Sequence, residues 1–147
     1  MNSYTQLLYN NIIWVSLLAW FIAQLLKVIL TLIFKKKLDI RRLVGAGGMP
    51  SSHSALVVSL ATSVGSLEGY DSPIFALAFT FSLIVMYDAA GVRRAAGKQA
   101  AVLNEILDQI HTKRSIPEEK LKELIGHTPV EVIAGALLGF IVSKLFY

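Results

Sequence analysis

Two histidines begin apolar segments of the chain, and each stands beside side chains that suit phosphate chemistry. His53 follows two hydroxyl residues, Ser51 and Ser52, and His127 precedes Glu131 by four positions. On a helix this spacing puts the imidazole and the carboxylate on one face. Phosphoryl transfer needs a nucleophile, an acid and charge neutralisation, so these residues predict a phosphate site.

Charged side chains near the ends of other apolar segments extend this candidate site. Lys27 lies near the end of the first segment, and Asp88, Arg93 and Arg94 close the third. Because fixed cations and hydroxyls bind phosphate oxygens, we expect Lys27, the two arginines and the serine pair to contact substrate. We expect Asp88 to belong to the same substrate-binding set, where it can pair with one of the arginines.

Several of these residues also have purely structural interpretations, which the sequence leaves open. Ser51 can cap a helix, and Thr128 with Glu131 forms a capping box. Lys27 can extend its ammonium towards lipid headgroups, as lysines near the end of a span commonly do. Asp88 can form a structural ion pair with a neighbouring arginine.

The composition indicates the kind of protein that must position these residues. Of 147 residues, 54% are hydrophobic and only 16% are charged, and the apolar residues form long blocks typical of membrane spans. The absence of cysteine removes disulfides, thiolate metal sites and cysteine nucleophiles, and three histidines do not favour a zinc enzyme. Basic residues in so apolar a chain usually flank spans, so no nucleic-acid partner is expected.

The apolar blocks predict an all-α fold, a polytopic membrane helix bundle forming one domain over residues 1–147. About four transmembrane helices are expected, at residues 12–34, 50–67, 72–90 and 128–147. In residues 100–110 the apolar side chains recur with helical spacing and the polar side chains lie off that stripe. This pattern predicts a cytoplasmic amphipathic helix. A capping box at Ser115 and Glu118 predicts a short polar helix that Gly126 ends.

The distribution of basic residues predicts the orientation of these spans. The loop between the first two spans holds five Lys and Arg residues, and the segment between the third and fourth holds seven of the 14 in the chain. By the positive-inside bias both segments are cytoplasmic. The second and fourth helices then begin at that face, where their N–H groups and positive dipole ends attract phosphate. We therefore expect a multi-pass protein of the cell membrane with its active site on the cytoplasmic side.

The residues around both histidines resemble signatures of the type 2 phosphatidic acid phosphatase superfamily. Pro50-Ser51-Ser52-His53 is similar to its Pro-Ser-Gly-His signature, and the segment from His127 to Gly135 resembles its His-x-x-x-Asp-Val-x-x-Gly signature. With residues 87–94, Tyr-Asp-Ala-Ala-Gly-Val-Arg-Arg, the chain is most similar to a divergent branch called acid phosphatase/vanadium-dependent haloperoxidase-related. The resemblance covers nearly the whole chain.

This resemblance implies a metal-independent phosphatase, without a cofactor, that reacts through a phosphohistidine. It implies that His127 attacks phosphorus, that Glu131 orients its ring, and that His53 protonates the leaving oxygen. Ser51 and Ser52 would hold the phosphate oxygens, helped by the lysine and arginines named above.

The chain departs from the superfamily pattern at four positions. The first signature, a lysine followed seven residues later by Arg-Pro, is absent because Phe34 stands seven residues after Lys27. Ser52 replaces the glycine of the second signature, Glu131 replaces the aspartate of the third, and Leu121 stands where an arginine is expected. An alternative is therefore a catalytically inactive membrane protein that binds anions or lipids or assists transport.

The predicted function is a phosphoric ester hydrolase acting on a lipid phosphate. A cytoplasmic site suits lipids made in the inner leaflet, of the phosphatidylglycerophosphate or phosphatidate type. Undecaprenyl diphosphate phosphatase is a further alternative, and a soluble-type haloperoxidase is not favoured because no feature of the spans is linked to halide oxidation. The expected partners are the lipid substrate and membrane lipids. Gly135 and Gly139, four apart in an apolar span, suggest close helix packing or a homodimer.

Overall fold

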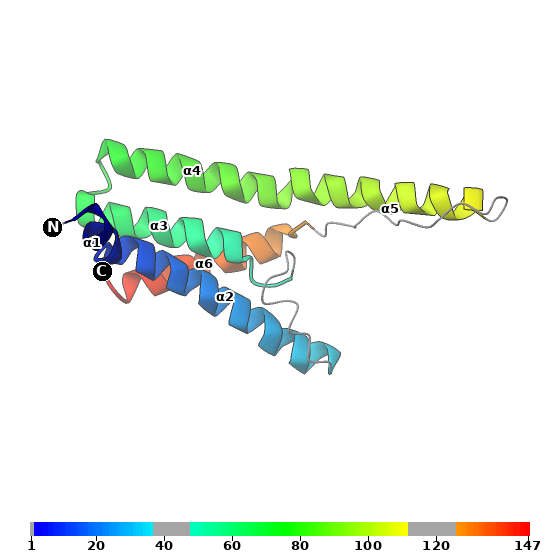
Figure 1. The fold of residues 1–147 in the computed structure, drawn as a ribbon, viewed down its shortest axis with the longest axis horizontal. Helices are drawn as coiled ribbons and strands as arrows, with labels where there is room; N and C mark the ends of the chain where they lie inside the picture. Colours follow the sequence, from blue (N-terminus) through cyan, green and yellow to red (C-terminus); the bar gives the residue numbers. More distant parts are fainter. Residues whose placement is uncertain (1, 37–47, 112–125) are drawn as a thin grey trace.

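The fold was obtained as a computed structural model that describes residues 2–36, 48–111 and 126–147 (Figure 1). These residues form helices and short connections without a β-strand, which confirms the predicted all-helical class for this part of the chain. The predicted polar helix that begins at Ser115 lies outside the described residues, as does Leu121. The helices are α1 (Ser3–Leu8), α2 (Asn11–Lys35), α3 (Ser52–Glu68), α4 (Pro73–Ala90), α5 (Val92–His111) and α6 (Pro129–Lys144).

The four helices of the bundle, α2, α3, α4 and α6, each begin at a polar cap. The side chains of Asn10, Ser51, Ser72 and Thr128 accept hydrogen bonds from the backbone N–H three residues further on. Such caps satisfy N–H groups that have no partner within the helix. Thr128 and Glu131 form the complete capping box that the sequence predicts.

Helix α3 packs against α2, α4 and α6, and α2 also packs against α6. The interior is built from small side chains, with Ala19 and Ala23 of α2 against Ala55 of α3 and Val142 of α6. Large apolar side chains such as Trp14, Leu77 and Ile133 are exposed instead. Small residues inside and large apolar residues outside are typical of helices that pack in lipid.

Two glycines allow α6 to approach α3 closely. A Cβ at Gly135 would lie 2.2 Å from the carbonyl oxygen of Ser51, and one at Gly139 would lie 2.3 Å from that of Ala55. The pattern that suggested a homodimer contact is therefore used for packing within the chain, because α3 already covers both glycines.

Two stretches of helix in the described residues are long and apolar enough to cross a membrane: Asn11–Phe34, and Pro73–Ile106 across α4 and α5. Helices α3 and α6, with 17 and 16 residues, are each about 25 Å long and therefore shorter than a typical hydrocarbon core of ~30 Å. Two of the four expected spans therefore meet this criterion in the described residues, and the count of four stays a prediction.

Helix α5 differs from the sequence-based expectation. It begins at Val92, eight residues before the predicted amphipathic segment, and runs on from α4 in nearly the same direction, away from the bundle (Figure 1). The short helix α1 was not predicted. It is six residues long, and the exposed Trp14 of α2 donates its indole N–H to the carbonyl of Leu8 at 2.8 Å.

Candidate functional site

The candidate site lies where α3 and α6 begin. Both helices start at the end of the bundle at which α2 and α4 finish, opposite the two chain ends (Figure 1). Two helix N-termini therefore meet at one place, and their N–H groups and dipoles make that place favourable for an anion.

His53 and His127 face each other at these N-termini. Their ring centroids are 6.0 Å apart and the ring planes are inclined by 65°. His127 is only 2% exposed, and His53 is half-buried in the first turn of α3. Near-attack positions need about 3–3.5 Å between reacting atoms, and proton transfer needs about 2.6–3.2 Å between heavy atoms. The separation of the rings is compatible with one phosphoryl group in contact with both.

Glu131 holds the ring of His127 and caps its own helix at the same time. Its Oε2 atom lies 3.2 Å from Nδ1 of His127 and accepts the backbone N–H of Thr128 at 2.9 Å. With Nδ1–H donated to the carboxylate, the imidazole carries its lone pair on Nε2, on the opposite edge of the ring. The structural and functional interpretations of Glu131 are therefore compatible.

Backbone hydrogen bonds fix the two segments that carry the histidines. The N–H of Ser51 donates to the carbonyl of Glu131 at 2.9 Å, which joins the start of α3 to the first turn of α6. The N–H of His127 donates to the carbonyl of Ala89 at 3.0 Å, which joins the segment before α6 to the end of α4. Three helices thereby set the position of the imidazole pair.

Lys27 reaches this end of the bundle from α2. Its side chain is 1% exposed, and Nζ donates to Ser52 Oγ at 3.1 Å and to Gln24 Oε1 at 2.8 Å. The interpretation in which Lys27 extends to the lipid headgroups is wrong, because the ammonium turns inward to the start of α3. Ser51 and Ser52 are buried beside it, and Ser51 Oγ accepts the N–H of Ser54 at 3.3 Å.

Gln24 was missed by the sequence interpretation. It is a buried amide one helical turn before Lys27, and it hydrogen-bonds that ammonium. Polar side chains are costly in an apolar span, and an i,i+3 spacing puts both residues on one face of the helix. That pattern in the sequence was the signal that identifies Gln24.

The other predicted substrate-binding residues lie at the junction of α4 and α5. Asp88 is half-buried in the last turn of α4, one residue before the carbonyl that accepts the N–H of His127. Arg93 and Arg94 belong to the first turn of α5, and their side chains lie outside the described part of the structure.

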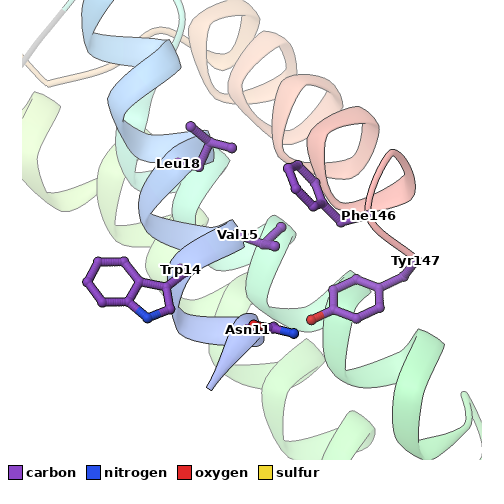
Figure 2. A pocket seen from close by; sticks show the side chains of 6 residues that line it. All are labelled: Asn11, Trp14, Val15, Leu18, Phe146 and Tyr147. Atoms are coloured by element: carbon purple, nitrogen blue, oxygen red, sulfur yellow. The ribbon is translucent and has the colours of Figure 1, made fainter. Parts of the chain in front are cut away.

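A cavity of about 260 Å³ lies at the opposite end of the bundle (Figure 2). Phe146 and Tyr147, which follow α6, face the first turns of α2 there, and Figure 2 shows the Tyr147 ring directed towards Asn11. No histidine lines this cavity, so it is separate from the candidate site.

Comparison with known proteins agrees with the resemblance seen in the sequence. The model of the family described as "Divergent PAP2 family" matches residues 8–142. The chain belongs to the Divergent PAP2 family. It is also 41% identical over 149 residues to "Uncharacterized membrane protein YuiD" of Bacillus subtilis (strain 168), with 94% of each chain covered. No solved structure matches the chain significantly.

The double role of Glu131 in this Divergent PAP2 protein leads to a first prediction. Glu131→Gln keeps an acceptor for the capping box but removes the charge beside His127. For the phosphatase reaction that the sequence predicts, we expect kcat for phosphate release to fall roughly ten- to a hundredfold with little change in stability. The measurement is phosphate release together with thermal unfolding in detergent. Thr128→Ala is the matched control, because it weakens the cap by about 1 kcal/mol and leaves the carboxylate in place. A larger loss of kcat in Thr128→Ala than in Glu131→Gln would contradict this assignment.

Proposed function

We propose that this membrane protein is a phosphatase that hydrolyses a lipid phosphate through a phosphohistidine on His127. The observation that carries the proposal is the imidazole pair, with centroids 6.0 Å apart at the meeting point of two helix N-termini and next to a buried lysine. Membership of a PAP2-related family supports the same reaction class.

In the first step, Nε2 of His127 attacks phosphorus and the bond from phosphorus to the leaving oxygen breaks. His53 donates a proton to that oxygen, so the product alcohol leaves neutral. Glu131 stabilises the positive charge that develops on the attacking ring. In the second step, His53 takes a proton from water, the water oxygen bonds to phosphorus, and the phosphorus–nitrogen bond breaks to release inorganic phosphate.

In this proposal, cationic side chains and two helix N-termini neutralise the charge on the phosphoryl oxygens. Lys27 supplies a buried ammonium, and the starts of α3 and α6 supply N–H groups and positive dipole ends. Arg93 or Arg94 completes the set by supplying the guanidinium that the chain lacks at the family's usual position.

For the membrane arrangement, we propose four spans with the site on the cytoplasmic side. Helices α3 and α6 are short because the non-helical segments before them, residues 48–51 and 126–128, occupy the remaining depth. Non-helical backbone at that depth is tolerated where protein covers it, and Ser51 and His127 are both buried. A cytoplasmic site favours phosphatidylglycerophosphate or phosphatidate over a substrate released on the other side.

The function is tested by phosphate release from purified protein in mixed micelles. Of phosphatidate, phosphatidylglycerophosphate and undecaprenyl diphosphate, we expect hydrolysis of one or both of the first two without added metal. We also expect inhibition by orthovanadate, which resembles the pentacoordinate transition state. Anion binding without hydrolysis of any of the three would favour the inactive anion-binding alternative. Turnover of undecaprenyl diphosphate alone would overturn the choice of substrate.

The orientation makes a separate prediction. Because the chain has no cysteine, a single introduced cysteine is a unique label. We expect an impermeant maleimide to label Asn2→Cys in intact cells and to label Lys98→Cys only after the membrane is opened. The reverse pattern would move the site to the other side of the membrane.

A further inference from the structure

Gln24 forms a hydrogen bond with Lys27 but has no part in the mechanism described above. Gln24, Lys27 and Ser52 are all at least nine-tenths buried, and they form a continuous set across the contact between α2 and α3. Gln24 Oε1 lies 2.8 Å from the ammonium, and Ser52 Oγ lies 3.1 Å from it on α3. The ammonium is therefore held between an amide on its own helix and a hydroxyl beside His53.

An anchor of this kind is needed because of the shape of lysine. The side chain has a flexible four-carbon stem, and in a span its ammonium moves to the headgroups unless other groups hold it. Gln24 stands one helical turn before Lys27, on the same face of α2. Its carbonyl oxygen therefore receives the ammonium on the interior side of the helix.

The chemical type of the anchor matters as much as its position. An amide oxygen accepts a hydrogen bond without adding a charge, whereas a carboxylate of the same size would form an ion pair with the ammonium. A neutral anchor fixes the cation and itself adds no negative charge beside it. Glutamine and glutamate are nearly equal in volume, so this difference can be tested at one position.

We propose that Gln24 is a positioning residue that holds the Lys27 ammonium against the start of α3 through a neutral acceptor, so that its charge acts on a tetrahedral oxyanion bound there. This role rests on the proposed phosphatase site, and it adds a residue that determines the affinity of that site for anions.

The test is binding of orthovanadate to the full-length protein in detergent, measured by calorimetry, together with thermal unfolding. For Gln24→Glu we expect the dissociation constant to rise at least tenfold, because the introduced carboxylate pairs with Lys27. We expect the unliganded variant to be at least as stable as the wild type for the same reason, a combination that a purely packing role would not produce. Gln6→Glu, the same change at an exposed position on α1, is the matched control and should bind as the wild type does.

Gln24→Met keeps the test decisive where Gln24→Glu fails to fold. It removes the acceptor without adding charge, and we expect about threefold weaker binding of orthovanadate. Wild-type affinity in a folded Gln24→Glu, or in Gln24→Met where only that variant folds, would overturn the role of Gln24 and leave the proposed function intact. Absence of orthovanadate binding and of phosphatase activity in the wild type would overturn the proposed function and this role together.

Discussion

His127→Ala is expected to lower phosphate release by at least about a thousandfold, because it removes the atom that bonds to phosphorus. The measurement is release of inorganic phosphate under saturating lipid substrate. Brief reaction with a ³²P-labelled substrate, followed by alkaline denaturation, should leave label on the wild-type protein and none on His127→Ala. The wild-type label should be stable in base and lost in acid, as a phosphoramidate is.

Two further variants make this result specific. His53→Ala removes the acid but not the nucleophile, so we expect a smaller loss, of about a hundredfold, with His127 still able to carry label. His111→Ala changes a histidine at the end of α5, outside the segments that begin α3 and α6, and should retain wild-type activity. Equal rates for the wild type and His127→Ala would remove the enzymatic interpretation.

Gly135→Val is expected to have the largest effect on folding. The added Cβ would lie 2.2 Å from the carbonyl oxygen of Ser51, and that backbone cannot move away without disturbing the hydrogen bond from Ser51 to Glu131. Overpacking of this kind costs about 1–3 kcal/mol and occasionally more. We expect a clear fall in thermal stability and loss of phosphate release, because His53 lies on α3 and His127 directly precedes α6, the two helices that would separate.

Leu137→Val tests whether this effect belongs to the contact between α3 and α6. Leu137 lies two residues further along α6 and is 58% exposed, so its shortening should change stability by no more than about 0.5 kcal/mol. A melting temperature of Gly135→Val that matches that of Leu137→Val would show that α3 and α6 tolerate a larger separation.

Much of the helical structure follows from local signals. The predicted starts near residues 50, 72 and 128 agree with α3, α4 and α6 to within three residues, because a cap residue and, for two of them, a proline stand at those points. The start of α5 was placed too late, since residues 92–99 lack a clear apolar stripe, whereas the helix begins at Val92, two residues after α4 ends. The helix α1 has no strong periodicity over its six residues, so the sequence gives no signal for it.

The candidate site was predicted less completely than the helices. A cap, a histidine and a carboxylate at fixed spacing are local features, and they indicated the residues at the starts of α3 and α6. The inward direction of Lys27 is not a purely local feature. The ammonium donates to Gln24 on its own helix and to Ser52 on α3, and the second contact depends on how α2 and α3 pack. Gln24 was missed although its i,i+3 spacing to Lys27 is a local signal, because the amide becomes a candidate site residue only when the ammonium is known to turn inward.

The sequence by itself determined that the chain forms apolar helices and where most of these helices begin. It also determined which polar side chains stand at the starts of α3 and α6. Only the tertiary structure decided that Gly135 and Gly139 pack against α3 of the same chain, and that the rings of His53 and His127 lie 6.0 Å apart. The physical reason is the distance along the chain over which each effect acts. Caps and periodicity act over three or four residues along one helix, whereas the distance between two side chains on different helices depends on how closely their backbones can pack.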